Sequence, residues 1–170
     1  LMRERPTIAL PDDHDVYQGN IWGESGRDCG GIKGHSQGGY AMHEDFVNAV
    51  QRTQTDHHPA PFDPTPVERG IGVYYGDMIY GRVGFAILED RKFKSGPEGK
   101  VNYWKGRPDH VKDPEFVPSS VDKEGLVLLG ERQLRFLRNF AGDWKGTDLK
   151  VALSQTIFCN LANYHGGSQQ

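Results

Sequence analysis

The chain has 170 residues, of which 36% are hydrophobic and 25% charged, and its net charge is −3. This composition fits one domain with a modest core, and without a dense basic stripe it gives no support for a nucleic-acid-binding surface. No apolar run approaches the roughly 18–20 residues that a membrane span needs. The 22 glycines and 10 prolines exclude a helical bundle and predict many turns and ordered loops.

Residues 7–10, Thr-Ile-Ala-Leu, predict a short strand that ends at Pro11. Their continuous apolar character is typical of a strand covered on both faces, as in a parallel sheet. The acidic run, residues 12–15 with the sequence Asp-Asp-His-Asp, then follows at the carboxyl end of that strand. Ligands bind at such strand ends in open α/β sheets. The eight glycines between residues 16 and 40 predict a loop.

A helix is predicted over residues 42–52, because apolar side chains share one face and acids occupy the first turn. The apolar face would carry Phe46, Val47 and Val50. Residues 56–68 contain four prolines and predict an extended, ordered loop. Residues 72–88 then predict a β-hairpin with its tight turn at Gly81 and Arg82.

Residues 90–125 are polar and contain several prolines, and a loop of this length inside a compact domain is usually functional. A second helix is predicted over residues 131–144, where one apolar stripe recurs at helical spacing. The stripe consists of Leu134, Leu137, Phe140, Ala141 and Trp144. A short strand is predicted over residues 150–154, so the order of elements indicates a mixed α/β fold.

The acidic run places three carboxylates and one imidazole in four consecutive positions. Like charges this close raise each other's pKa unless a cation neutralises them. Carboxylate oxygens suit Ca, Mg, Mn and ferric iron, and histidine tolerates softer metals. His14 can also donate to a substrate oxygen, with a neighbouring acid fixing its tautomer. The alternative is an acidic turn that caps a loop or helix and has no role in chemistry.

Several segments resemble the alkaline phosphatase D-like (PhoD-like) family of calcineurin-like metallophosphoesterases. The first is residues 6–22, which contain the acidic run. Residues 70–75 and 84–94 resemble the family's hairpin, which ends in an acid and an arginine. Residues 129–137 resemble its Leu-Gly-x-x-Gln-x-x-Phe-Leu helix start, and residues 150–156 resemble the strand that follows. The segments occur in the family's order and cover essentially the whole chain.

The resemblance implies roles for three residues of the acidic run. Asp13 occupies the position of a metal ligand, and His14 occupies the position of the acid that contacts and protonates the scissile phosphate ester. Asp15 lies where an acid orients that histidine. Asp12 occupies the position of a glycine in the wider superfamily and has no role implied by the resemblance, but its carboxylate would help to hold a metal. The implied reaction is hydrolysis of a phosphate mono- or diester by metal-activated hydroxide. Ca and Fe are the metals expected from the resemblance, with Mn, Mg or Zn as alternatives.

Gln155 departs from the pattern of ordinary calcineurin-like enzymes, in which a metal-binding histidine follows this strand. Its carbonyl oxygen would be the metal ligand instead. The family's first and last metal-binding segments have no counterpart among residues 1–170. We therefore expect a single partial metallophosphatase domain, inactive by itself, whose fold is part of a sandwich of mixed sheets flanked by helices with long ordered loops. The resemblance also implies a secreted or periplasmic parent protein.

Three further residues are candidates for binding the substrate. Arg91 follows a predicted strand and would contact phosphate, although an ordinary ion pair explains it equally well. Asn20 fits the family's loop, with loop packing as the alternative. His165 lies about ten residues after the last predicted strand and is a weaker candidate. Two other classes of function remain open: a catalytically silent homologue, and an ion- or carbohydrate-binding module whose acidic loop holds a structural ion.

Overall fold

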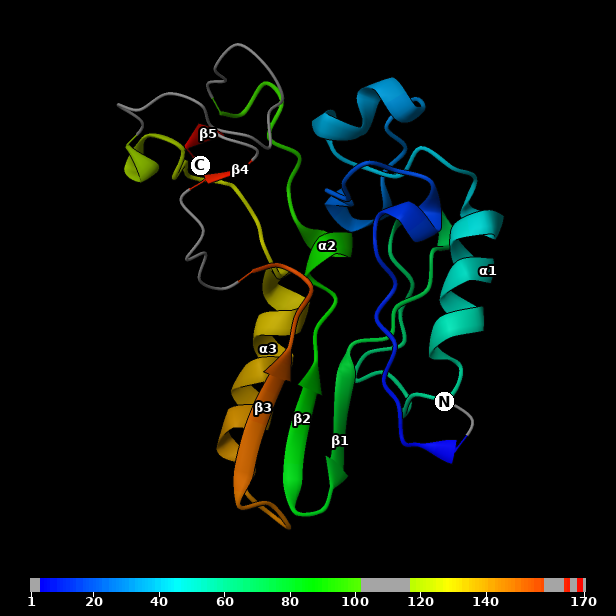
Figure 1. Ribbon diagram of the computed structural model, residues 1–170, viewed down its shortest axis with the longest axis vertical. Helices are drawn as coiled ribbons and strands as arrows, with labels where there is room; N and C mark the ends of the chain where they lie inside the picture. The colour runs from blue at the N-terminus through cyan, green and yellow to red at the C-terminus, as the bar shows by residue number, and fades with distance from the viewer. Residues whose placement is uncertain (1–3, 102–116, 158–163, 166–167, 170) are drawn as a thin grey trace.

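The computed structural model describes residues 4–101, 117–157, 164–165 and 168–169. Its main sheet contains β1 (Gly76–Tyr80), β2 (Val83–Ile87) and β3 (Leu149–Leu153) in that spatial order. The first two strands are antiparallel, whereas β3 runs parallel to β2 (Figure 1). This sheet and its helices confirm the predicted mixed α/β class.

The predicted hairpin is confirmed, with β1 and β2 joined by a two-residue turn. Gly81 and Arg82 have φ values of 57° and 65°. Positive φ at both central positions is the geometry that matches the right-handed twist of the flanking strands. Residues 73–75, expected to begin the sheet, are buried extended chain that leads into β1.

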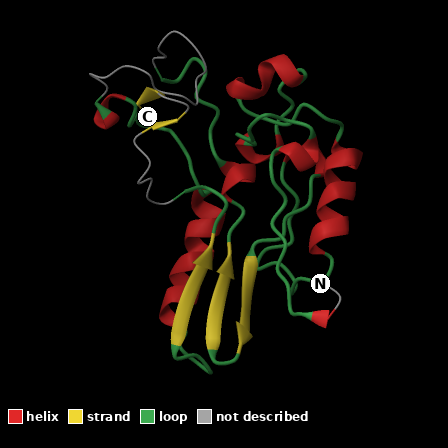
Figure 2. Ribbon diagram, viewed as in Figure 1, coloured by secondary structure: helices red, strands yellow, loops and turns green. Residues whose placement is uncertain are grey.

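One face of the sheet is covered by α3 (Gly130–Gly142), which runs along the strands (Figure 2). The helix is confirmed, but the predicted stripe is partly wrong. Phe136 and Gln133 are fully buried, whereas Leu134 is 40% exposed and Trp144 lies beyond the end of the helix. Leu137 and Phe140 do pack against the core. The buried face is therefore rotated, because Phe136 packs against the rings of Tyr75 and Phe62.

The predicted helix at residues 42–52 is confirmed as α1 (Glu44–Thr55), whose first turn carries the expected acids. The ring nitrogen Nδ1 of His43 caps it by accepting a hydrogen bond from the Asp45 backbone N–H. On the predicted face Val47 is buried, but Phe46 is 39% exposed. Val47 joins a second core cluster formed mainly by the residues before α1.

The predicted strand at residues 7–10 is wrong. The segment is extended, but within the described chain it pairs with no strand. Side chains contact its carbonyl groups instead: Nε2 of His57 lies 2.9 Å from the Thr7 oxygen, and Nε2 of Gln155 donates to Leu10 at 3.2 Å. A run of apolar residues makes a strand only where another strand offers hydrogen-bonding groups.

The remaining elements are short. The glycine-rich loop at residues 16–40 is confirmed as irregular chain with single 3-10 turns, η2 (His14–Val16), η3 (Glu24–Gly26) and η4 (Ile32–Gln37). A further turn, η5 (Glu68–Gly70), precedes β1, and η6 (Pro118–Ser120) lies in the predicted long loop. That loop begins with the one-turn helix α2 (Asp90–Phe93), and β4 (Tyr164–His165) pairs with β5 (Ser168–Gln169) near the end of the chain.

Candidate active site

Residues 89–92, which we call the junction, follow β2 and comprise the N-cap and the first three residues of α2. The carboxylate of Glu89 accepts a hydrogen bond from the Tyr74 backbone N–H at 2.9 Å and forms an ion pair with Lys92. The side-chain amide of Gln133 binds the Glu89 backbone on both sides, accepting from its N–H at 2.8 Å and donating to its carbonyl at 3.3 Å. All four of these side chains are buried. The junction is thereby held rigidly between α3 and the core.

Arg91 of the junction reaches the acidic run. Its Nη1 lies 2.8 Å from Oδ1 of Asp12 and 3.0 Å from Oδ1 of Asp13. Burial and a hydrogen bond with Asp13 raise the pKa of Asp12. Burial would also raise the pKa of Asp13, but the hydrogen bond with Asp12 and the charge of Arg91 lower it. Asp13 is therefore the more readily ionised member of the pair, as a metal ligand must be.

The acidic run forms a tight turn of its own. The Asp13 carbonyl accepts hydrogen bonds from the backbone N–H groups of Val16 and Gln18. The Asp15 carboxylate accepts from the Asp12 backbone N–H at 2.8 Å. The side chain of His14 is 89% exposed, and its Nε2 lies 3.8 Å from Oδ2 of Asp13. The carboxylate nearest to the imidazole is thus that of Asp13, whereas Asp15 stabilises the turn.

Gln155, two residues after β3, contacts the chain just before the acidic run. Its Nε2 donates hydrogen bonds to the carbonyl oxygens of Leu10 and Pro11. Its Oε1, the atom predicted to bind a metal, is buried and has no hydrogen-bond partner within the described residues. Gln155 therefore holds the chain just before the acidic run, and its amide nitrogen is the group that faces that chain.

The other two predicted substrate-binding residues are not joined to this group by any hydrogen bond of the described chain. The side-chain oxygen of Asn20 is buried without a partner there. His165 lies in β4, and only its backbone is described. The structure therefore brings together four of the eight candidates, Asp12, Asp13, Arg91 and Gln155, with His14 and Asp15 adjacent in the chain.

The residues of this site fit a metal ion only in part. Across the described ranges, no three His, Cys, Asp or Glu side chains are placed to share one cation. Arg91 occupies Oδ1 of both Asp12 and Asp13 and is itself the counter-charge to the acidic run. Oδ2 of Asp13 is not bound by Arg91 and lies 3.8 Å from Nε2 of His14. The described residues therefore do not complete a metal site, and a metal centre here needs ligands from elsewhere.

Sequence reasoning missed Asp90 and Gln18 near the site. Gln18 is 2% exposed, and its side chain accepts a hydrogen bond from Ala41 and donates to Asn20 and Gly39, which ties the turn to the glycine-rich loop. Asp90 is fully buried and binds the chain after β3. The sequence offered one signal for Asp90, namely that it is an acid directly before the candidate Arg91. It offered no signal for Gln18.

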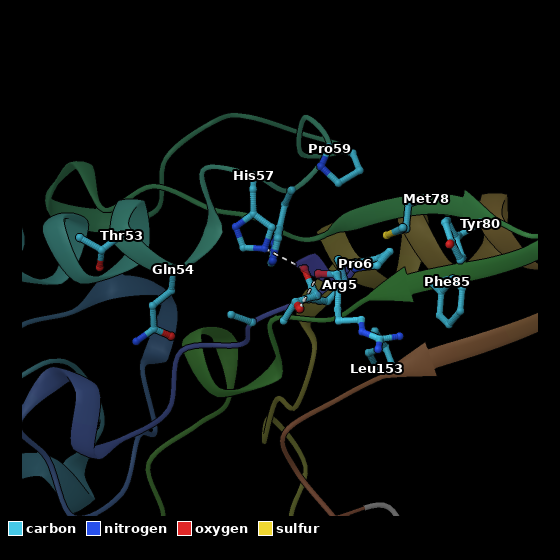
Figure 3. Close-up of a pocket in the computed structure, with 14 residues that line it drawn as sticks. Arg5, Pro6, Thr53, Gln54, His57, Pro59, Met78, Tyr80, Phe85 and Leu153 are labelled. Carbon is cyan, nitrogen blue, oxygen red and sulfur yellow. Dashed lines mark hydrogen bonds between the residues drawn. The ribbon is translucent and has the colours of Figure 1, made fainter. Parts of the chain in front are cut away.

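A large cavity lies away from the candidate residues. It has a volume of about 1240 Å³ and lies between residues 5–9, the end of α1 and the sheet face opposite α3 (Figure 3). Apolar side chains from the three strands line it, namely Met78, Tyr80, Phe85 and Leu153. His57 and His58 border it, with ring centroids 4.8 Å apart. We call it the sheet groove, and none of the candidate site residues lines it.

No protein-family model, curated protein or solved structure matches this chain. Within the part of the chain that the structure describes, no helix combines the length and apolar character that crossing a membrane requires.

Proposed function

We propose that this chain forms one wall of the active site of a metal-dependent phosphoesterase of the PhoD-like, calcineurin-like type. One observation carries the proposal: Arg91 contacts Asp12 and Asp13 directly, and Gln155 binds the carbonyl oxygens of the two residues just before them. Arg91 follows β2 and Gln155 follows β3, so the meeting point is the carboxyl end of two parallel strands. That edge is where α/β sheets bind ligands.

The proposal gives each residue a physical role. Asp13 offers Oδ2 to a metal while Arg91 holds its other oxygen. His14 projects from the turn into solvent, where its ring can reach the leaving-group oxygen of a bound phosphate ester and donate a proton to it. A bound metal ion would supply the activated hydroxide. Arg91 acts here by positioning the carboxylates, since both of its observed ion pairs are with the acidic run.

The proposal also requires more protein than residues 1–170. Among the described residues we assign one metal ligand, Asp13, whereas a hydrolytic metal centre needs at least three protein ligands in typical sites. We therefore place the other ligands, and the rest of a calcineurin-like sandwich, in further segments of a parent protein. The isolated chain is expected to show no hydrolysis of phosphate esters, and Ca or Fe is the expected metal of the complete site.

The test uses the parent protein that carries this chain and an aryl phosphate diester as substrate. Asp13→Ala removes the metal ligand and His14→Ala removes the acid, so each should lower kcat/KM by about 100-fold or more. Circular dichroism should show an unchanged fold in both variants. Asp77→Ala, an exposed acid on β1 remote from the acidic run, is the matched control and should retain activity. Near-parent activity in both site variants contradicts the proposal.

The ion pairs of Arg91 favour a second candidate, in which the acidic run is a structural turn of a catalytically silent homologue. Arg91 would then replace a metal as the permanent counter-charge. Mn²⁺ titration of the parent protein separates the two functions. Metal binding that Asp13→Asn weakens supports the enzyme, whereas absence of binding in the parent and in Arg91→Gln supports the silent homologue.

A further inference from the structure

Asp90 holds the chain that leaves β3. Its side chain is 0% exposed. Oδ1 accepts hydrogen bonds from Oγ of Ser154 at 3.1 Å and from the Gln155 backbone N–H at 3.3 Å. Oδ2 accepts from the Thr156 backbone N–H at 3.1 Å and from the Thr156 hydroxyl. One carboxylate therefore satisfies two backbone donors that have no ladder partner after the strand ends.

The chain held by Asp90 in turn holds the acidic run. The backbone N–H of Gln155 is bound to Asp90, and the Gln155 side chain donates to the carbonyl oxygens of Leu10 and Pro11. Arg91, the next residue after Asp90, binds both Asp12 and Asp13. In the described chain, these are the hydrogen bonds and ion pairs that join residues 10–15 to segments beyond residue 20. The remaining polar contacts of the acidic run are internal to its turn.

We infer that Asp90 is a positioning residue, which sets the location of the acidic run through Gln155. It touches no residue of the acidic run itself. Its carboxylate fixes the backbone from which the Gln155 side chain extends, and Gln155 then fixes residues 10–11. The adjacent Arg91 approaches the same segment from α2, so a single helical turn determines both restraints. The importance of this placement for catalysis rests on the proposed phosphoesterase function, but the placement itself does not.

The experiment compares amide NMR spectra of the full chain and of Asp90→Asn. This substitution keeps the side-chain shape, but it turns an amide donor toward backbone donors. We expect exchange of the Gln155 side-chain amide protons to rise by about tenfold or more, and the Asp12 and Asp13 backbone resonances to shift. If changes stay within residues 154–156, Asp90 only caps the end of β3 and the inference is wrong.

Two further variants test the path from Asp90 through Gln155 to the acidic run, and a third variant is the control. Gln155→Leu should shift the Asp12 and Asp13 resonances and leave the Thr156 amide protected, because the link to Asp90 remains. Asp77→Asn should change neither region. Where Asp90→Asn does not fold, Thr156→Val removes one of the four donors to Asp90 and should shift the Asp13 resonance in the same direction by less. An unchanged Asp13 resonance in folded Thr156→Val overturns the inference.

Kinetics of the parent protein separate positioning from function. Asp90→Asn should lower kcat by about 10- to 100-fold with little change in KM, because misplaced reacting groups slow the step after binding. Should Asp13→Ala retain full activity, the proposed function fails, whereas the NMR result on Asp90 still stands. Should Asp90→Asn leave kcat unchanged while Asp13→Ala abolishes activity, the phosphoesterase stands and positioning by Asp90 has no catalytic consequence.

Discussion

The guanidinium group of Arg91 resolves the charge repulsion within the acidic run. Three carboxylates in four positions require a counter-charge. Arg91, which is separated from the acidic run by more than seventy residues, lies within 3.0 Å of two of them. The two carboxyl groups nevertheless differ, because the pKa of Asp12 is raised and the pKa of Asp13 is lowered. Arg91 thus supplies a counter-charge to Asp12 and Asp13 from within the chain, and the metal of the proposal would serve the hydrolysis itself.

His58 provides a prediction at the same scale. Burial of its ring, with the nearby charge of His57, lowers the pKa of His58 below its ordinary value. The unfolded chain then binds the proton first as the pH falls through about 6.5. The stabilisation is fully present above that pH and is lost below it, so the urea midpoint should fall between about pH 7.5 and pH 5.5.

The groups that face His58 are His57, the Tyr74 ring and the backbone of Ala9. His58→Phe keeps an aromatic ring and removes the titration, so its urea midpoint should depend less steeply on pH. His43→Asn, which removes an exposed histidine and keeps a helix-capping side chain, is the control. An identical pH dependence in the wild type and in His58→Phe contradicts this account of His58.

The position of α3 on the sheet decides which of its residues are core. Phe136 lies among the rings of Phe62, Tyr75 and Phe140, and Gln133 binds the backbone of Glu89. Leu134, although apolar, points away from this contact. A buried glutamine with two backbone partners thus occupies a position that a hydrophobic stripe would give to leucine.

Substitutions in α3 test this orientation. Phe136→Ala removes a fully buried ring and should lower the free energy of unfolding by about 3–5 kcal/mol. Leu134→Ala removes a side chain that is 40% exposed and should lower it by about 1 kcal/mol or less. Urea unfolding monitored by circular dichroism gives both values. Equal losses in the two variants are incompatible with the observed helix face.

Only one face of the main sheet is covered by a helix in the part of the molecule that the structure describes. In Figure 1, α3 lies behind the strands, and the opposite face carries the apolar lining of the sheet groove. Tyr80, on that face, is 59% exposed. Contiguous apolar surface of this kind is unusual on an isolated soluble domain. The sheet groove is therefore a partly exposed apolar surface of the described chain.

The sheet groove should bind an apolar fluorescent dye. Its volume of about 1240 Å³ is large enough for a molecule of that size. Tyr80→Ser removes a large part of the apolar wall and should weaken the dye fluorescence. Trp144→Ser, which removes an exposed aromatic side chain outside the groove, should leave it unchanged. Equal fluorescence in the wild type and in Tyr80→Ser contradicts binding in the groove.

The sequence by itself determined the elements whose evidence is local. The Gly81–Arg82 turn, the helices α1 and α3 and the strand β3 were predictable, because turn chemistry and helical spacing depend on neighbouring residues. The same reasoning failed for residues 7–10 and for the face of α3. A strand needs a partner from elsewhere in the chain, and the orientation of a helix is set by what packs against it.

The candidate site, like the fold, was predictable only in part. The composition of the acidic run marked residues 12–15, and the positions of Arg91 and Gln155 after predicted strands marked them as candidates. Only the tertiary structure decided that Arg91 neutralises the acidic run and that Gln155 presents its nitrogen to the chain before it. It also identified Asp90 as the link between them. These are contacts across 64 to 145 residues, and their geometry follows from the packing of β2 against β3.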